Sequence, residues 1–443
     1  MARPKSLPIR EELRKLFPTS KLRALARETG AVIRVRKVDA AELFWSVVLG
    51  FGGGSARSLA GLRRAYERAS GERIEESSFF NRFNAGFAKM MRVAFQRALL
   101  SMTQPEAALR GALGAFADVM LTDSTVVRLH HLLEKSFPAC RTNHTRAALK
   151  LHTIMSVKTS GMRSIKITSE RRHDGPVLVV GRWVREKLLV FDLGYFSYHL
   201  FARINQNGGF FLSRIKSNCN AVIVANNRRS PGRSRLVAGL PLQEAIAGLK
   251  RGFVDVTVSV SFNRRGYDGN GGRRDHQHLR VVGVRDERSG EFHLYATNAP
   301  AEKLSAEDVR AVYACRWQIE LLFKELKSHY RLEDLPSRNK HIVEALIFAS
   351  LITALISRQL LAAVRKKLRR LAERTPEQRW ATLFAACAND LLLIVLRARR
   401  HTLGLHSHLA GYLLHEAVDP NVDRPGLVRS IEMRRHLYMR KAA

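Results

Sequence analysis

The stretch of sequence that decides the fold is DVMLTD at residues 118–123, an apolar run that lies between two acidic residues and ends in Asp123. A short apolar run of this kind predicts a β-strand that is buried in the interior. The same pattern returns in LLVFDLG at residues 188–194, where the second run ends in Asp192. The sequence therefore predicts two buried strands, each of which delivers a carboxylate where the hydrophobic layer ends.

The residues around these two runs predict the rest of an α/β layer. Residues 149–158 and 162–169 indicate two further strands, a helical linker follows them, and residues 209–215 indicate a fifth strand. A three-strand meander followed by alternating helix and strand is the order of a ribonuclease H-like sheet. We therefore expect an α/β protein with an RNase H-like mixed-sheet catalytic core. In that topology the first and fourth strands are neighbours, so Asp123 and Asp192 face each other.

The regions outside this layer differ from it in their pattern of apolar and charged residues. Alternating apolar stretches at 254–260, 279–284 and 292–297 predict antiparallel strands of a β-rich insertion, whereas both ends of the chain are helical and basic. We expect five regions in order: a helical DNA-binding region at 1–105, the first part of the core at 106–216, the β-rich insertion at 217–304, the core's catalytic helix at 305–365, and a basic helical C-terminal region at 366–443.

The N-terminal region has short helical patterns joined by tight turns. Helices are expected at 38–48, 59–69 and 77–99, and the glycine-rich residues 50–55 between the first two indicate a turn rather than a phosphate-binding loop, because no Gly-Lys-Ser/Thr ending follows. Short basic helices of this kind are typical of proteins that read DNA grooves, although three-helix packing without any ligand has the same pattern.

The charge of the chain indicates a polyanionic partner. Lys and Arg number 75 against 39 Asp and Glu, which gives a net charge of +36. A nucleic acid is the favoured partner, ahead of an anionic membrane surface or no specific partner at all. The four cysteines are scattered without a C-x-x-C pair, which excludes an obvious zinc site or disulfide framework and fits a reducing compartment. The apolar run at 345–356 is shorter than the ~20 residues that span a bilayer, so we expect a buried helix there. The expected location is the cytoplasm, with the protein associated with the bacterial nucleoid when bound.

A second pattern lies in YACRWQIELLFKELK at residues 313–327. Tyr313, Arg316 and Lys327 lie seven residues before, four before and seven after Glu320, and at ~3.6 residues per turn these offsets fall within about 60° on one helical stripe. The adjacent face is apolar and should pack on the sheet; it comprises Val312, Cys315, Ile319, Phe323 and Leu326. A solvated Arg316–Glu320 pair, worth only ~0.5 kcal/mol, would explain those two residues but not the whole stripe.

Close carboxylates are costly unless a cation neutralises them. Hard oxygen ligands suit magnesium or manganese, so the two aspartates predict a divalent metal site. For each aspartate taken alone, the alternative is that it merely caps the turn that follows its strand.

These motifs together resemble a known family. The pattern Tyr-x-x-Arg-x-x-x-Glu-x6-Lys, filled by Tyr313, Arg316, Glu320 and Lys327, is similar to the signature of DDE transposases of the insertion-sequence-four group. DST at residue 123 and DLGYF at residue 192 resemble that family's two aspartate motifs, and the TN at residues 297–298 is similar to its exit from the insertion. The resemblance covers roughly residues 117–335.

The resemblance implies a DNA transposase that binds the ends of an insertion sequence and performs metal-dependent cleavage and strand transfer. Asp123, Asp192 and Glu320 would bind two divalent ions, Mg²⁺ or Mn²⁺, one to activate a water or 3′-hydroxyl and one to stabilise the leaving oxygen. The expected DNA contacts are Tyr313, Arg316, Lys324 and Lys327. Double-stranded DNA of the transposon ends and target is the implied partner, with a homodimer in the DNA complex.

One feature departs from the family pattern. Several members excise through a DNA hairpin whose flipped base stacks on a tryptophan of the insertion, but this chain has no tryptophan between Trp183 and Trp317. Phe292, His293 and Tyr295 are the remaining aromatic candidates. Two competing functions stay open at this point: an RNase H-like nuclease or resolvase without strand transfer, and a non-catalytic DNA-binding relic of a transposase.

Overall fold

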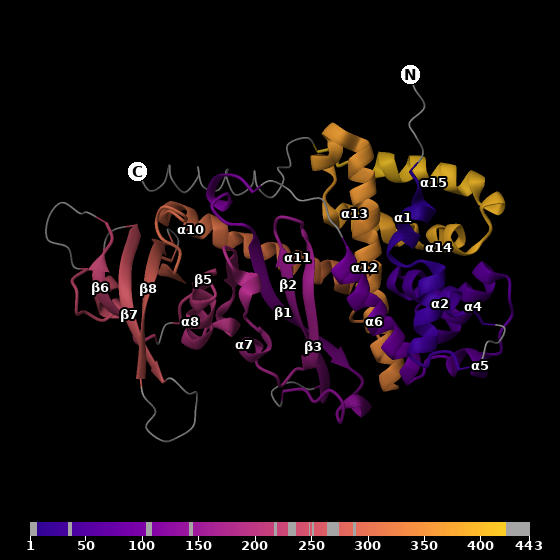
Figure 1. The fold of residues 1–443 in the computed structure, drawn as a ribbon, viewed down its shortest axis with the longest axis horizontal. Coiled ribbons are helices and arrows are strands. Elements are labelled where there is room, and N and C mark those ends of the chain that lie inside the picture. Colours follow the sequence, from indigo (N-terminus) through magenta and orange to yellow (C-terminus); the bar gives the residue numbers. More distant parts are fainter. Residues whose placement is uncertain are drawn as a thin grey trace.

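The fold was obtained as a computed structural model of the chain. It describes residues 7–33, 38–102, 109–140, 145–216, 219–228, 236–247, 249, 252–263, 274–286 and 289–421. Figure 1 shows a long sheet that runs from the insertion strands β6–β8 to β3, beside a body of helices that holds both the first and the last helices of the chain. The Gly-, Arg- and Asn-rich residues 229–235 and 264–273 lie outside the described residues.

Nine strands form a single sheet in the order β3-β2-β1-β4-β5-β9-β8-β7-β6. Their bounds are β1 Val119–Leu129, β2 Ala147–Ser156, β3 Gly161–Ser169, β4 Leu188–Phe191, β5 Phe210–Arg214, β6 Val222–Asn226, β7 Phe253–Asn263, β8 Arg274–Arg285 and β9 Phe292–Thr297. β1, β2 and β3 form an antiparallel meander, and β4 and β5 join β1 in parallel. This is the RNase H-like order, and the expected fold class is confirmed.

The expected neighbours β1 and β4 are indeed paired, with Thr122 opposite Phe191, so Asp123 and Asp192 occupy adjacent positions. The prediction that the first strand ends at Asp123 is wrong. β1 continues to Leu129 because its second half pairs with residues 147–152 of β2, which gives those backbone groups partners. Asp123 therefore projects from the middle of a long strand.

The segment between β3 and β4 also differs from expectation. Instead of a helical linker it contains only the four-residue helix α7 Asp174–Val177 and the 3₁₀ turn η4 Arg182–Val184. His173 and Gly175, together with Pro176, leave little helical propensity in this stretch. The far side of β1–β3 is consequently covered by an irregular segment rather than by a long helix.

The insertion strands continue the core sheet. β9 pairs antiparallel with β5, Leu212 lying opposite Thr297. The hydroxyl of Thr297 donates to the carbonyl of Phe211 at 2.6 Å, and the side chain of Asn298 accepts from the Phe211 N–H at 2.9 Å. The three strands expected at 254–260, 279–284 and 292–297 are confirmed within β7, β8 and β9. The Thr297–Asn298 pair thus joins the insertion to the core.

Alternation along the strands assigns the two faces of the sheet. On β1, Val119, Leu121 and Val127 pack into the larger core with the helices, whereas Met120 packs with Leu189 into the smaller core. Because side chains alternate along a strand, Asp123 lies on the same face of the sheet as Val119, Leu121 and Val127. The helix α11 (Trp317–Ser328) contacts β1, α6 (Ala85–Ser101) contacts β3, and α10 (Ala306–Tyr313) contacts β5 and β8. The bounds of the later helices are α8 Tyr198–Gln206, α9 Leu242–Ile246, α10 Ala306–Tyr313, α11 Trp317–Ser328, α12 Lys340–Leu368, α13 Glu377–Ala386, α14 Ala388–Leu396 and α15 Leu403–Glu416.

The first and last helices of the chain pack together around α12. The N-terminal helices are α1 Ile9–Leu16, α2 Thr19–Glu28, α3 Ala40–Val47, α4 Leu59–Ser70, α5 Glu76–Phe80 and α6 Ala85–Ser101. α12 contacts α1, α6 and the π-helical turn η1 Val48–Gly52, and it also contacts α13 and α15 (Figure 1). The N-terminal helices therefore share one hydrophobic core with the C-terminal ones.

Two details of the N-terminal region differ from the sequence prediction. The single helix expected at 77–99 is two helices, because Asn84 caps α6 by accepting from the Phe87 N–H at 3.0 Å. The glycine-rich turn begins inside a π-helical turn. A Cβ at Gly52 would lie 2.0 Å from Oγ1 of Thr353, so only glycine permits this approach to α12.

One stretch, Lys340–Arg374, is long and apolar enough to cross a membrane, but 89% of its apolar window is buried inside the fold. A buried core helix passes the same test of length and composition. The expected buried helix at 345–356 is confirmed within α12.

Candidate active site

Three carboxylates reach one location from three separate elements. Asp123 lies in the middle of β1, Asp192 directly follows β4, and Glu320 lies in the first turn of α11. Asp192 and Glu320 both lie close enough to Asp123 to raise the pKa of that carboxyl group. The parallel β1–β4 pairing and the contact of α11 with β1 explain why residues up to 197 positions apart meet here (320 − 123).

Neither aspartate serves as a turn cap. Asp123 lies within a strand, and its Oδ1 accepts only the N–H of the next residue, Ser124, at 2.8 Å. Asp192 precedes the 3₁₀ turn η5 Leu193–Tyr195, but its side chain makes no capping hydrogen bond. The alternative prediction, that each of these aspartates merely caps the turn after its strand, is therefore wrong.

Arg316 bridges two of the three carboxylates. Its Nη1 lies 2.9 Å from Oδ2 of Asp123, and its Nη2 lies 2.5 Å from Oε1 of Glu320. The Arg316 and Asp123 side chains are only 19% and 18% exposed, so solvent screens this contact weakly. Burial alone would lower the pKa of Arg316, but the surrounding Tyr313, Asp123 and Glu320 raise it on balance. The guanidinium is a fixed positive charge among the acids.

The surroundings of Asp123 act on its pKa in opposite directions. Burial raises its pKa to about 6, with Asp192 and Glu320 adding to the rise, while the Ser124 N–H and Arg316 oppose it. A carboxylate that is costly to ionise in the free protein is typical of a functional site. The cost falls when a cation arrives.

Tyr313 reaches the third carboxylate. Its hydroxyl donates to Oδ1 of Asp192 at 3.4 Å, and its ring packs against that of Tyr295 at 5.0 Å. Burial and the nearby Asp192 raise the pKa of Tyr313 well above its ordinary value. The phenol therefore stays protonated and acts as a hydrogen-bond donor.

The two lysines of the predicted stripe differ in placement. Nζ of Lys327 lies 3.1 Å from the carbonyl oxygen of Val126, three residues beyond Asp123 on β1, and 2.6 Å from Oε1 of Glu333. Lys324 is exposed on the surface of α11, away from these contacts. The structure thus brings Tyr313, Arg316 and Lys327 to the site and leaves Lys324 on the exposed side of α11.

The helix predicted at residues 313–327 is not continuous. A 3₁₀ turn, η6 Ala314–Arg316, separates α10 from α11. The break lies where the chain changes from packing on β5 and β8 to packing on β1. The predicted apolar face is nevertheless buried throughout, with Val312, Cys315, Ile319, Phe323 and Leu326 each at most 7% exposed.

The three aromatic candidates in the insertion differ in how far they are exposed to solvent. Tyr295 is 5% exposed and enclosed against Tyr313, whereas Phe292 and His293 are partly exposed at the start of β9. Trp317 is 56% exposed in the first turn of α11.

Sequence reasoning missed a fourth carboxylate, Asp174 in α7. Its Oδ1 lies 3.2 Å from Nδ1 of His152 and 3.5 Å from Nζ of Lys150, both on β2. Burial would raise the pKa of Asp174, but His152, Ser124 and Lys150 lower it on balance. A Cβ at Gly194 would lie 3.2 Å from its Oδ2. Asp174 therefore links the segment after Asp192 to β2, one of the two neighbours of β1. In the sequence it lies in an irregular stretch without periodicity.

The three predicted ligands suit a hard divalent cation in donor chemistry and charge. Within the described residues, however, no three His, Cys, Asp or Glu side chains are already gathered closely enough to hold a metal ion. Arg316 contacts Asp123 and Glu320 instead. The three carboxylates therefore suit such an ion in their chemistry, while two of them are paired with Arg316.

Comparisons with known proteins find relatives among the transposases of insertion sequences. The chain is 21% identical over 378 residues to the transposase for insertion sequence element IS1151 of Clostridium perfringens, covering 78% of this chain and 79% of that protein. It is 22% identical over 401 residues to the transposase for insertion sequence element IS231F of Bacillus thuringiensis subsp. israelensis, covering 81% and 82%. Among solved structures, the piggyBac transposase synaptic complex with hairpin DNA is similar over 95% of this chain and 87% of its own, at 9% identity and a TM-score of 0.49.

The family model for the transposase DDE domain matches residues 114–356, the segment that runs from just before β1 into α12 and contains all three carboxylates. This match spans more than half of the 443 residues. The chain therefore belongs to the family of proteins that carry the transposase DDE domain.

Proposed function

We propose that this transposase cuts DNA at the ends of its own insertion sequence and joins them to target DNA, with Asp123, Asp192 and Glu320 as its catalytic carboxylates. The observation that supports this most is the convergence of the three acids with Arg316, which contacts two of them, and Tyr313, which contacts the third. Metal-dependent phosphodiester cleavage uses carboxylates that bind the metal and groups that grip the scissile strand, and the site holds side chains suited to both tasks.

Asp123, Asp192 and Glu320 are proposed to hold two Mg²⁺ or Mn²⁺ ions. When bound, such ions supply Lewis-acid activation of the attacking oxygen and charge stabilisation at the leaving one. Each carboxylate has a rigid support: a paired strand for Asp123, the end of a buried strand for Asp192, and the first turn of α11 for Glu320. Supports of this kind fix the donor oxygens before the DNA arrives.

Arg316 is proposed to exchange partners during the reaction. In the free protein it neutralises Asp123 and Glu320; with DNA bound it turns its guanidinium to a phosphate, which a planar two-donor group suits. Tyr313, whose hydroxyl contacts Asp192 in the free protein, would donate a hydrogen bond to the same DNA backbone. Lys327 and the exposed Lys324 would extend the line of cations along α11. These four residues would position the scissile strand over the carboxylates.

The experiment that tests this function is cleavage of end-containing duplex DNA in Mg²⁺, with the DNA taken from the sequence that flanks the gene. Wild type is compared with Glu320→Gln, which keeps the shape of the side chain and removes its charge. Glu344→Gln on α12, 24% exposed and paired with Lys340 outside the site, is the matched control.

We expect wild type and Glu344→Gln to nick at the element boundary and to join the ends to target DNA, while Glu320→Gln binds the same DNA without cutting. Cutting without joining would identify a nuclease or resolvase instead. Binding by all three proteins without cutting in Mg²⁺ or Mn²⁺ would identify a DNA-binding relic.

A homodimer is the proposed assembly, because transposition pairs two DNA ends, and the bacterial cytoplasm, with the nucleoid DNA, is the proposed location. Sedimentation of the protein with paired-end DNA tests the assembly. A particle with one protein chain per two ends would contradict it.

A further inference from the structure

A cavity of about 570 Å³ lies on the face of the catalytic sheet opposite the three carboxylates. Its floor is formed by β1, β2 and β3, and its cover is the irregular segment between β3 and β4 that stands where a helix was expected. Met120 and Thr122 of β1 line it, so the cavity and Asp123 share one strand and lie on opposite sides of it.

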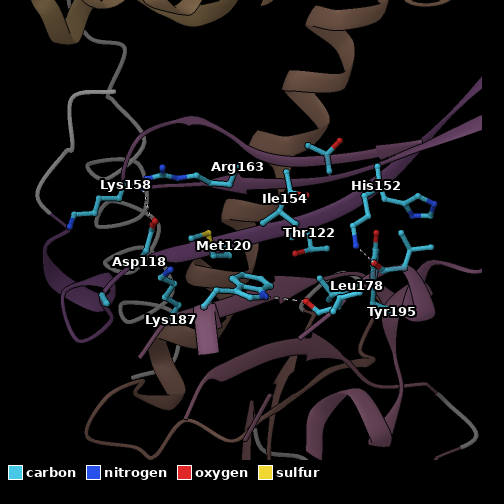
Figure 2. Close-up of a pocket in the computed structure, with 17 residues that line it drawn as sticks. Asp118, Met120, Thr122, His152, Ile154, Lys158, Arg163, Leu178, Lys187 and Tyr195 are labelled. Carbon is cyan, nitrogen blue, oxygen red and sulfur yellow. Dashed lines mark hydrogen bonds between the residues drawn. The ribbon is translucent and has the colours of Figure 1, made fainter. Parts of the chain in front are cut away.

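The two ends of the cavity differ in chemistry, as Figure 2 shows: Lys158, Arg163 and Lys187 gather at one end, and His152 and Tyr195 stand at the other. Lys166 also lines it. Within the described part of the chain, Arg163, Lys166 and Lys187 have no carboxylate within ion-pair distance. The only acid in the lining is Asp118, whose oxygens already accept from Ser156 and from two backbone N–H groups. The cationic end therefore suits an anion.

The polar end carries hydroxyl groups that lack partners. Oγ1 of Thr122 and the hydroxyl of Tyr195 are buried and make no hydrogen bond with any residue that the structure describes, and both residues are 2% exposed. Buried hydroxyls without a partner destabilise the fold unless a ligand or water meets them. Their position at the wall of a cavity indicates a ligand with its own donors and acceptors.

Trp183 supplies a flat apolar surface between these ends. Its indole N–H is held by the carbonyl oxygen of Val179 at 3.0 Å, and Nζ of Lys187 lies 6.0 Å from the ring centroid. Met120 and Ile154 contribute apolar contacts on the strand side. An aromatic plane with cations beside it is the arrangement that binds an unpaired base and its phosphates.

We propose that this cavity binds one unpaired nucleotide of a DNA strand, with its base on Trp183, its base edge at the Thr122 and Tyr195 hydroxyls, and its phosphates at Arg163 and Lys187. The volume suits a single small ligand and excludes a duplex, so the nucleotide enters extrahelically. DNA rather than a free nucleotide is favoured because the chain carries a net charge of +36, and because the cavity borders both aspartate-bearing segments through Thr122 and Tyr195. The inference rests on the proposed function only in taking DNA as the ligand.

The test uses the full chain in EDTA, so that no cleavage occurs and binding is measured independently of catalysis. The probes are a 20-base-pair duplex with one unpaired 2-aminopurine at its centre and the same duplex with that base paired. Wild type should bind the bulged duplex about tenfold more tightly, which corresponds to about 1.4 kcal/mol, and should quench the 2-aminopurine fluorescence by stacking.

Trp183→Leu should abolish both the preference and the quenching, while binding of the paired duplex stays the same. Arg163→Ala, on the exposed edge strand β3, should weaken binding of the bulged duplex several-fold and flatten its salt dependence. Arg182→Ala is the matched control, because Arg182 is an exposed arginine next to Trp183 that does not line the cavity.

Equal affinity of wild type for the two duplexes would overturn the proposal, as would a preference that survives both Trp183→Leu and Arg163→Ala. If Trp183→Leu does not fold, Arg163→Ala decides the question, since an exposed side chain leaves the core intact. Competition by deoxyadenosine monophosphate as strong as that by the bulged duplex would assign the cavity to free nucleotides and also overturn it. Failure of the cleavage assay in Mg²⁺ leaves this binding result unaffected, so the two proposals fail separately.

Discussion

Arg316 donates a 2.9 Å hydrogen bond to Asp123 across 193 positions of sequence, and the same guanidinium holds Glu320 one helical turn away. The contact places a permanent cation among three carboxylates that are expected to bind metal. The proposed metal site therefore implies that Arg316 and a divalent ion compete for Asp123 and Glu320. In the structure Arg316 is paired with both of these carboxylates.

Arg316→Gln should raise metal affinity and abolish cleavage. The guanidinium of Arg316 lies a few ångströms from the carboxylates. Removing its positive charge should raise their affinity for a divalent cation by at least about tenfold at the dielectric of a partly buried site. Cleavage should fall by about 100-fold or more, because a phosphate-gripping donor is lost. Mn²⁺ titration by electron paramagnetic resonance without DNA measures the first effect, with the exposed Arg338→Gln as control. Weaker Mn²⁺ binding by Arg316→Gln would contradict the competition.

Asp123→Asn should change how stability depends on pH. The pKa of Asp123 is raised from 3.8 to about 6 in the fold, so the folded state favours its protonated form. The contribution of Asp123 to the free energy of unfolding is fully present below pH 3.8 and is lost as pH rises through 6. The loss amounts to about 3 kcal/mol. Asparagine stays neutral, so the variant should gain stability relative to wild type over that range.

Urea denaturation of both proteins in EDTA at pH 4 and pH 7.5 measures this difference. The variant's advantage should be larger at pH 7.5, and added Mg²⁺ should stabilise wild type alone. A difference in unfolding free energy that is the same at both pH values would show that Asp123 ionises freely in the fold.

Asp174→Ala and Gly194→Ala should be energetically coupled. The alanine methyl at position 194 would lie 3.2 Å from Oδ2 of Asp174, tighter than ordinary contact. Gly194→Ala should therefore cost less in the Asp174→Ala background, by about 0.5 kcal/mol or more. A double-mutant cycle by urea denaturation gives the coupling, and additive effects would place the two residues out of contact. Asp174→Ala alone should also slow cleavage, because it releases His152 and Lys150 next to β1.

Gly52→Ala should destabilise the helical body. Its Cβ would lie 2.0 Å from Oγ1 of Thr353 on α12, and relieving that overlap costs about 1–3 kcal/mol. Gly404→Ala is the matched control, because nothing lies within 4 Å of the added methyl group on α15, and there alanine should stabilise the helix by up to about 1 kcal/mol. Thermal denaturation of the two variants should move in opposite directions. Equal shifts would mean that η1 and α12 are not closely packed.

The sequence predicted the parts of this protein that are encoded locally. The apolar runs before Asp123 and Asp192 gave the two neighbouring strands, and the spacing from Tyr313 to Lys327 gave the stripe on the catalytic helix. The roles of these residues remain predictions. Strand order followed because few topologies accommodate a meander and two crossovers.

Features set by long-range packing were not predictable. β1 extends past Asp123 only because β2 offers a partner for residues 124–129, and the 3₁₀ turn at Ala314–Arg316 depends on where α10 and α11 change neighbours. Asp174 has no periodic pattern around it, so only the fold reveals its neighbours. The cavity beneath the segment after β3 likewise exists because an expected helix did not form.

The pairing of β9 with β5 has a mechanical consequence. A domain inserted through two flexible linkers swings about them, but here the return strand is hydrogen-bonded into the core and Thr297 and Asn298 fasten it further. Force exerted on β6–β8 is therefore passed through the hydrogen-bonded sheet toward β4 and β1. Asp123 lies in β1 and Asp192 directly follows β4, so the outer strands are coupled mechanically to the strands that position both aspartates.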